Sequence, residues 1–176
     1  MSKPLFHQLL DDGFNQLPQP IRYLHNGQSK VLNGRCNVLR GTGVLSRLFA
    51  WATSLPPAGD DQPIEVSIEC NHHEEVWTRR FGNRRMTSYL SAQGTTLVEY
   101  LGPTRFKFML AYDATTQVIN WRLINVRAMG IPLPVSWFDA VTASESVNNG
   151  RYGFDVAAAL PIVGLLVKYK GWLDVG

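Results

Sequence analysis

The sequence is poor in cysteine, in long apolar runs and in net charge, and each scarcity excludes a class of protein. Cys36 and Cys70 are the only cysteines and lack the spacing of metal ligands, so we expect free thiols in a reducing cytoplasm. The longest apolar run, residues 156–167, is interrupted by Pro161 and Gly164 and is too short to span a bilayer. The N-terminus lacks the apolar core of a signal peptide. These absences predict a cytoplasmic protein without a membrane span.

The amounts of charged and apolar residues are those of an ordinary globular chain. The net charge is only +3, and both signs occur throughout, so there is no basic arm that would favour nucleic acid. Hydrophobic residues make up 45% of the chain and charged residues 18%, which is typical of an ordered protein. We therefore expect a single domain, 1–176, with a sizeable core and no affinity for nucleic acid.

Motifs of nucleotide-binding enzymes and hydrolases are also missing. Two glycines, Gly41 and Gly43, precede a predicted helix, but a plain loop explains them better than a phosphate site. The chain has no nucleophile elbow. His72 and His73 are adjacent and would point to opposite faces of a strand, so a solvated turn is favoured over a metal site. We predict neither a metal nor a cofactor, and the sequence favours a protein that is not an enzyme.

A β-hairpin is the clearest local structure that the sequence does contain. Its turn is Gly82-Asn83, because Gly and Asn accept the positive φ of a tight two-residue turn. Two arginine pairs, Arg79-Arg80 and Arg84-Arg85, flank the turn and suggest an anion site. Strand alternation splits each pair across two faces, which leaves Arg80 as the one candidate for the interior. Exposed arginines that discourage edge pairing are the alternative interpretation.

The first part of the chain, residues 1–62, is predicted to be helical and loop-rich with one strand. We expect short helices over 4–12 and 17–25, a strand over 34–41 and a helix over 44–55. His25 follows the second helix, and we interpret it as a helix cap instead of a catalytic group. The apolar face of the last helix consists of Val44, Leu48, Trp51 and Leu55.

The second part, residues 63–176, follows a polar connector at 57–63 and alternates strand-like segments with turn signals. Because short turns make neighbouring strands antiparallel, we predict a meander of eight to nine strands that curls into a closed or half-open barrel. Two or three short helices near the N-terminus would cover one end, which makes the fold class α+β and mostly antiparallel β. The predicted strands are 64–70, 75–81, 84–90, 95–101, 105–112, 118–127, 139–147, 151–160 and 165–172.

Charged side chains on these apolar strands leave two arrangements open. Glu99 lies between Leu97 and Leu101, and Asp155 has apolar neighbours on both sides. Some of these groups could pair inside the barrel, for example Arg80 with Glu99, which would suggest a wet cavity. Equally, all of them could lie on the outer, solvated face.

Eleven short segments, taken in order, carry a likeness to a known family: 17–25, 34–35, 40–43, 55–59, 77–81, 99–103, 121–123, 130–134, 150–155, 160–164 and 169–173. Together they resemble the bacterial domain of unknown function 4166 family. The likeness implies a module that occurs alone or as a C-terminal companion to NAD(P)-binding domains of the saccharopine-dehydrogenase-like or epimerase type. It implies no reaction and no catalytic residues. The matched polar positions are His25, Arg80, Glu99, Asp155 and Tyr169.

The leading hypothesis is a non-catalytic module that binds a small hydrophobic or lipid-like ligand in a barrel cavity. A closed barrel of this size leaves room inside, and a few polar groups would orient the guest. The residues expected to line the cavity are Arg80, Glu99, Trp121, Tyr152, Asp155 and Tyr169.

Two alternatives come from other classes of function. An interaction module would serve a separate NAD(P)-dependent dehydrogenase or epimerase-type enzyme, with a filled barrel and an exposed apolar patch around 130–138. An enzyme would use Arg80, Glu99 and Asp155, which requires that these three side chains converge in one cleft.

Overall fold

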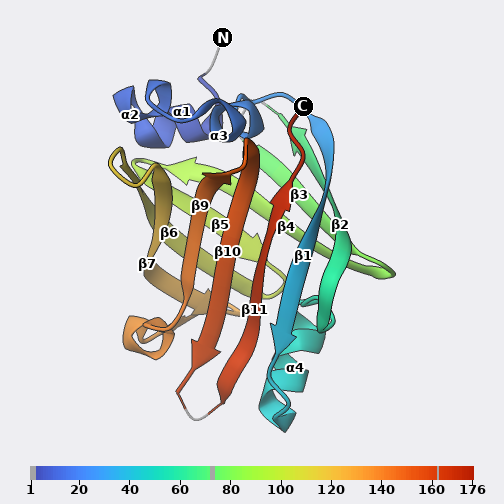
Figure 1. Ribbon diagram of the computed structural model, residues 1–176. Helices are drawn as coiled ribbons and strands as arrows, with labels where there is room; N and C mark the ends of the chain where they lie inside the picture. The colour runs from blue at the N-terminus through green and yellow to red at the C-terminus, as the bar shows by residue number, and fades with distance from the viewer. Residues whose placement is uncertain (1–2, 72–73, 162) are drawn as a thin grey trace.

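The computed structural model describes residues 3–71, 74–161 and 163–176 and shows an antiparallel β-barrel with helices at both ends (Figure 1). The helices are α1 (Leu5–Leu10), α2 (Asp12–Asn15), α3 (Gln19–Leu24), α4 (Val44–Ala52) and the 3-10 helix η1 (Val135–Phe138). The strands are β1 (Lys30–Arg40), β2 (Gly59–Cys70), β3 (Glu74–Phe81), β4 (Arg84–Gln93), β5 (Thr96–Leu101), β6 (Thr104–Asp113), β7 (Val118–Ala128), β8 (Ile131–Leu133), β9 (Thr142–Asn148), β10 (Arg151–Leu160) and β11 (Gly164–Leu173).

Ten of these strands form a closed ring, and β8 is an extra strand on β7. Two pairings close the ring: one joins distant parts of the chain, and the other is a hairpin of consecutive strands. Strand β1 pairs with β2 on one side and with the C-terminal β11 on the other, where Gly34 lies opposite Leu173. Strand β6 pairs with β7 from Thr104 opposite Ala128 to Asp113 opposite Val118. The ring thus has no free edge along these strands.

Two glycines allow β1 and β11 to approach each other closely. A Cβ atom at Gly34 would lie 1.8 Å from the carbonyl oxygen of Trp172, and one at Gly171 would lie 2.2 Å from that of Arg35. No side chain fits at such distances. Glycine at both positions is therefore a condition for closing the barrel at this seam.

Helices α1, α2 and α3 cover the upper end of the barrel in Figure 1. They are too short to be stable alone and are held by burying apolar side chains on the barrel. The buried residues of this cap include Phe6, Phe14, Ile21 and Leu24. The Tyr112 hydroxyl at the end of β6 donates a hydrogen bond to the Gln16 carbonyl, 3.1 Å away, and fixes the cap to the barrel.

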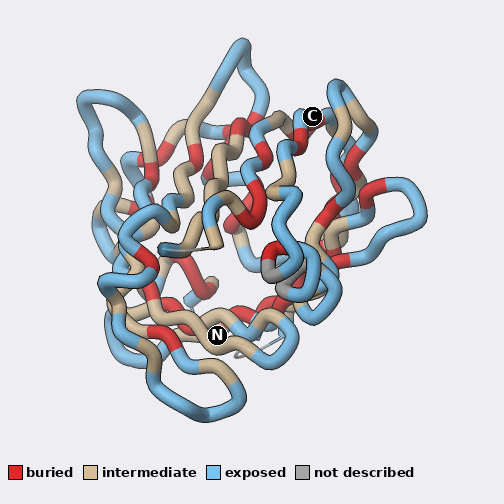
Figure 2. The backbone as a smooth tube through the Cα atoms, turned by 90° about the horizontal axis from the view of Figure 1, so that it is seen from below, coloured by how far each residue is buried: buried red, intermediate tan, exposed pale blue. Residues whose placement is uncertain are grey.

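Alternation along each strand separates the interior of the barrel from its outer surface. On β3, Trp77, Arg79 and Phe81 point inward, because the first two line an internal cavity and the third is buried. Seen from the lower end, the buried parts of the chain gather toward the ring, whereas the projecting loops are exposed (Figure 2). The core is therefore the inside of the barrel together with the underside of the cap.

Helix α4 lies at the lower end, opposite the cap (Figure 1). The Ser46 hydroxyl donates hydrogen bonds to the carbonyls of Gly41 and Leu165, at 3.3 and 3.1 Å, and so anchors the helix to the start of β11. Among the described residues, no helix has both the length and the apolar content needed to cross a lipid bilayer.

Most of the predicted elements are confirmed, including the two-residue turn at Gly82-Asn83, where Gly82 has φ +55° and Phe81 pairs with Arg84. The predicted count of eight to nine strands is too low, because β1 joins the ring and the short β8 was missed. The segment 59–62 belongs to β2 and is no connector; its residues Asp60 and Asp61 are exposed.

Two further predictions are wrong in detail. A strand was predicted from residue 139, but residues 135–138 form η1 and β9 begins only at Thr142. Pro134 precedes η1 and lacks the N–H that a strand ladder needs. The helix predicted over 44–55 ends at Ala52. Val44, Leu48 and Trp51 of its apolar face are exposed, whereas Leu55 lies beyond the helix and lines the internal cavity.

Candidate functional site

The interior of the barrel contains a cavity of about 150 Å³. A volume of this size accommodates a molecule about as large as a benzene ring. The cavity extends from Trp121 and Glu145, below the cap, to Leu55 and Ala158 near the other end. Its wall is mostly apolar. The apolar lining includes Ile64, Val66, Met86, Leu101, Phe106, Phe108, Phe154, Val156 and Val167.

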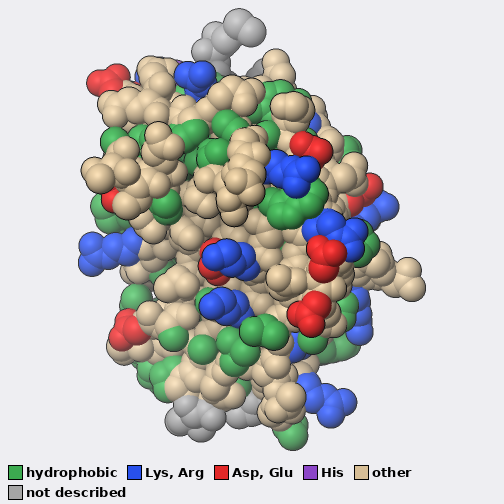
Figure 3. Space-filling model, viewed as in Figure 1, with side chains coloured by type: hydrophobic (Ala, Val, Ile, Leu, Met, Phe, Trp, Pro, Cys, Tyr) green, Lys and Arg blue, Asp and Glu red, His purple; other side chains and the backbone are tan. Residues whose placement is uncertain are grey.

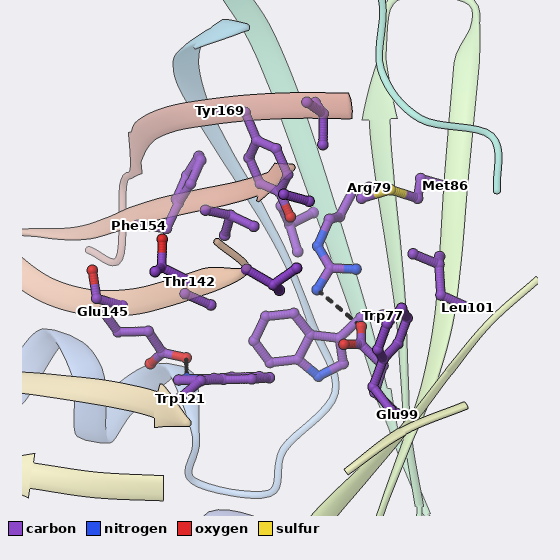
Figure 4. Close-up of a pocket in the computed structure, with 18 of the residues that line it drawn as sticks. Trp77, Arg79, Met86, Glu99, Leu101, Trp121, Thr142, Glu145, Phe154 and Tyr169 are labelled. Carbon is purple, nitrogen blue, oxygen red and sulfur yellow. Dashed lines mark hydrogen bonds and ion pairs between the residues drawn. The ribbon is translucent and has the colours of Figure 1, made fainter. Parts of the chain in front are cut away.

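Arg79 and Glu99 form an ion pair within this apolar wall (Figure 4). Arg79 Nη2 lies 4.0 Å from Glu99 Oε1, and both side chains are largely buried. Arg79 Nη1 also donates to Ser88 Oγ at 2.9 Å, and the guanidinium lies 5.3 Å from the Trp77 ring centroid. The ion pair is long, so the guanidinium keeps N–H donors that a ligand oxygen could accept from.

Two tyrosines complete the polar side of the cavity. Figure 4 shows Tyr169, Arg79 and Glu99 pointing toward one another from three different strands. Burial raises the pKa of Tyr169, and burial followed by the charge of Glu145 raises the pKa of Tyr152 well above its ordinary value. The positive charge of Arg79 lowers the pKa of both tyrosines and so reduces these shifts. Both hydroxyls therefore remain protonated at physiological pH and can donate hydrogen bonds.

A second buried network lies where the cavity meets the cap. His25 Nε2 lies 2.6 Å from Glu145 Oε2, and the Trp121 indole N–H donates to Glu145 Oε1 at 3.1 Å. The His25 ring stacks on Phe6 at 3.5 Å, and its Nδ1 has no hydrogen-bond partner among the described residues. Because the Glu145 carboxylate is an acceptor, His25 Nε2 carries the proton of this hydrogen bond and donates it to Glu145.

Glu75 lies near this network and is buried as well. The Trp77 indole N–H donates to Glu75 Oε2 at 2.9 Å. Burial raises the pKa of Glu75, and the nearby charges of His25 and Lys30 and the Trp77 hydrogen bond reduce the rise. The two carboxylates, Glu75 and Glu145, thus each have an indole donor.

Four of the six predicted cavity residues line the cavity: Glu99, Trp121, Tyr152 and Tyr169. The other two do not. Arg80 is exposed, with its Nε 3.7 Å from Glu65 Oε1, and Asp155 pairs on the outside with Lys170 at 3.2 Å. The expected pair of Arg80 with Glu99 is therefore wrong, because Arg79 occupies the inward position. Arg80, Glu99 and Asp155 do not converge, so they do not form the cleft that the enzyme hypothesis required.

Sequence reasoning missed Arg79, Glu145 and the buried role of His25. Arg79 could have been found, because it alternates with the large apolar residues Trp77 and Phe81. His25 does end α3, where its backbone N–H donates to the Ile21 carbonyl, but its imidazole binds Glu145. Glu145 lies in a polar stretch, and no local signal marks it as interior.

No group of three or more His, Cys, Asp or Glu that could hold a metal ion occurs in the described part of the chain. The predicted turn at His72-His73 lies outside the described residues. In the segment 130–138, predicted as an apolar docking patch, Ile131 and Trp137 are exposed while Phe138 is buried.

The fold and cavity define a small antiparallel β-barrel that is capped by helices at one end and contains a mostly apolar cavity with an internal ion pair. The model of the domain of unknown function 4166 family matches residues 17–173, nearly the whole chain, and the protein belongs to this family. No curated protein matches the sequence.

Proposed function

We propose that the protein binds a small, largely apolar molecule inside its barrel. The observation that supports this is the cavity of about 150 Å³ whose apolar wall contains a paired arginine. Side chains fill a barrel of about eight strands, whereas a wider ring leaves room for a guest. Burying an arginine in an apolar wall costs free energy, so its presence there suggests a function. Orienting a bound ligand is such a function.

The polar groups define the chemistry of the ligand. Arg79 and the Tyr169 hydroxyl offer donors on one side of the cavity. Most of the remaining wall is apolar, and its other polar side chains include Thr142, Ser144, Glu145 and Tyr152. A guest with a hydrocarbon body and one carboxylate or carbonyl group satisfies both parts. The carboxylate of the ligand would accept hydrogen bonds from the Arg79 guanidinium in competition with Glu99. This competition is favoured because Arg79 and Glu99 are 4.0 Å apart and bind each other only weakly.

The ligand reaches the cavity from the end opposite the cap. At the capped end, the bond between His25 and Glu145 and the buried helices close the barrel. At the other end the lining includes Leu55, Val141 and Ala158, which lie beside the loops and α4. A ligand that enters through this lower end does not disturb the buried hydrogen bonds of His25.

Two measurements test the proposal. Native mass spectrometry of the purified protein detects a co-purified guest, and calorimetry compares hexanoate with hexanol as added guests. We expect hexanoate to bind more tightly, and replacing both charges, Arg79→Leu with Glu99→Leu, to remove the preference. Arg80→Leu, one residue away on the outer face, is the matched control and keeps it. Failure of both guests to bind, together with no co-purified molecule, contradicts the proposal.

A further inference from the structure

Helix α4 has the composition of a buried helix but lies on the surface. Ser46 and Arg47 are its only polar residues, and Ser46 is used to anchor the helix to β11. Val44, Leu48 and Trp51 are nevertheless 82%, 57% and 77% exposed. Spacings of four and three residues place these three side chains on one face. A cluster of large apolar residues on a surface helix indicates that something covers it.

Further exposed apolar residues surround the same end of the barrel. Met129 and Ile131 flank the turn between β7 and β8, and Trp137 lies in η1; each is at least half exposed. In Figure 3 hydrophobic side chains are visible in the lower part of this face, and a Lys or Arg side chain lies at its lower right edge. We call the exposed apolar set the mouth rim. It consists of Val44, Leu48, Trp51, Met129, Ile131 and Trp137.

Backbone contacts show that one side of the mouth rim is continuous. The end of α4 lies against the turn between β5 and β6, because a Cβ at Gly102 would lie 2.8 Å from the Ala52 carbonyl oxygen. The next residue in that turn, Pro103, accepts a 2.8 Å hydrogen bond from the Met129 N–H. Helix α4, the β5–β6 turn and the β7–β8 turn therefore lie side by side around the open end.

The charges near the mouth rim are mainly arginines without acidic partners. Among the described residues, Arg47, Arg84, Arg85 and Arg127 form no ion pair, and all four are exposed. Arg84 lies near Arg40, whose pKa is lowered by burial and then by the charge of Arg84. The acidic residues of this end are Asp60, Asp61 and Asp139, and Asp61 is held by Arg35 at 2.7 Å.

We propose that the mouth rim docks onto a lipid bilayer that contains anionic lipids. Exposed tryptophans are suited to the interface between headgroups and acyl chains, and unpaired arginines beside them are attracted to lipid phosphates. A second copy of the chain is a poorer occupant, since a two-fold interface would bring the same arginines of both copies together. The positive charge around an apolar patch thus favours an anionic membrane surface.

Docking in this orientation places the open end of the barrel against the membrane. Leu55, three residues beyond α4, lines the cavity, and Arg40 Nη1 donates to its carbonyl at 3.3 Å and to that of Pro56 at 2.7 Å. An apolar molecule could pass from the bilayer to the cavity beside this segment. This last step rests on the proposed ligand binding, whereas docking itself does not.

Co-sedimentation with vesicles tests the docking. The protein is mixed with vesicles of phosphatidylcholine alone and with vesicles in which roughly a quarter of the lipid is phosphatidylglycerol. We expect binding to the anionic vesicles and little to the neutral ones. The double variant Leu48→Ser with Trp51→Ser should lose at least about tenfold in vesicle affinity, because two buried apolar contacts are removed. Tyr89→Ser, an exposed aromatic on the outer wall, is the matched control and should bind as the unchanged protein does.

The charge contribution is tested separately. Arg84→Ser with Arg85→Ser should weaken binding to anionic vesicles by roughly tenfold or more, whereas Arg22→Ser, at the capped end, should not change it. All of these side chains are exposed, and thermal unfolding verifies that each variant is folded. Equal binding to both kinds of vesicle, no binding at all, or dimers that the Leu48 and Trp51 changes dissociate would each overturn the proposal.

The two proposals fail separately. The double variant Arg79→Leu with Glu99→Leu changes only interior residues and should still bind anionic vesicles. The Leu48 and Trp51 variant should still bind hexanoate in solution. If the unchanged protein binds hexanoate but not the anionic vesicles, the docking proposal alone fails. If the unchanged protein binds the anionic vesicles but neither guest, and no guest co-purifies, ligand binding alone fails.

Discussion

His25 Nε2 and Glu145 Oε2 are 2.6 Å apart, although 120 residues separate them in the chain. His25 belongs to the helical cap and Glu145 to β9, and both side chains are buried. The contact therefore joins the start of the chain to its last third. Because Glu145 also accepts from Trp121, one carboxylate links the cap, β7 and the cavity wall.

Removing the imidazole should destabilise the fold strongly. In His25→Leu, the buried Glu145 carboxylate loses one of its donors, and losses of this kind cost about 3 kcal/mol or more. Glu145→Gln should cost less, about 1 to 2 kcal/mol, since the amide can accept from Trp121 and donate to His25 in its other tautomer, which leaves only the Nδ1 proton unpaired. Urea unfolding measures both.

His7→Leu is the control for His25→Leu, because His7 lies in the same cap, stacks on Phe14 at 4.8 Å and is partly exposed. Its free energy of unfolding should change by no more than about 0.5 kcal/mol. Equal effects of the two histidine substitutions would show that the bond to Glu145 is not what holds the cap.

Glu75 should make stability depend on pH. Its folded pKa is raised, chiefly by burial, so the folded state holds the proton more tightly than the unfolded chain does. Its contribution to stability is then fully present below the unfolded pKa and is lost as the pH rises through the folded pKa. Glu75→Gln keeps an oxygen for the Trp77 N–H and removes the titration. We expect the variant to gain stability relative to the unchanged protein as the pH goes from about 4 to about 8.

Thermal unfolding at the two pH values measures the effect of Glu75→Gln. Glu74→Gln, the exposed neighbour, is the control and should shift unfolding equally at both. A Glu75→Gln variant that is less stable at the higher pH than at the lower, relative to the unchanged protein, would refute the prediction.

The strands were predictable because the residues that determine each strand are close together in the sequence. Alternating apolar residues and turn residues such as Gly82-Asn83 and Asn149-Gly150 determine each strand and its end. Closure of the ring was less accessible, since it depends on β1 pairing with β11 at the far end of the chain. The strand count fell short because this pairing brings β1 into the ring and because the short β8 was missed. Helix α4 shows the reverse problem: its apolar face is plain in the sequence, but the sequence does not say that the face stays uncovered.

The candidate site was only partly predictable, because alternation tells which residues share a face but not which face is interior. Arg79 and Arg80 are equivalent by alternation alone, and only the neighbours Trp77 and Phe81 distinguish them. Glu145 could not be recognised, since its partner His25 is close only in three dimensions. Glu99, Trp121, Tyr152 and Tyr169 line the cavity, and their strands also contribute apolar residues to its wall or to the core. Whether these four side chains bind a ligand stays a prediction.

The seam between β1 and β11 should tolerate no side chain at its glycines. Gly34→Ala and Gly171→Ala put a methyl group where a backbone oxygen already lies, and the strands must separate. We expect each to lose about 3 kcal/mol or more in the free energy of unfolding. Gly13→Ala is the control: it has no atom within 4 Å of the added Cβ and lies in α2, so it should be neutral or stabilising by up to about 1 kcal/mol. Three equal values in urea unfolding would contradict the close approach of the two strands.

Both thiols should react slowly in the folded protein. Burial raises the pKa of Cys36 and of Cys70 to about 11. At about pH 8 roughly one thiol in a thousand is then ionised, against about a quarter for a thiol of ordinary pKa, and only the thiolate attacks a disulfide reagent. We expect each thiol to react with Ellman's reagent at least about a hundredfold more slowly than in urea. Cys70 should be the faster of the two, because it is partly exposed and Cys36 is buried. The variants Cys36→Ser and Cys70→Ser assign the two rates, and a Cys36 that reacts as fast in the folded protein as in urea would show that the barrel wall beside it opens readily.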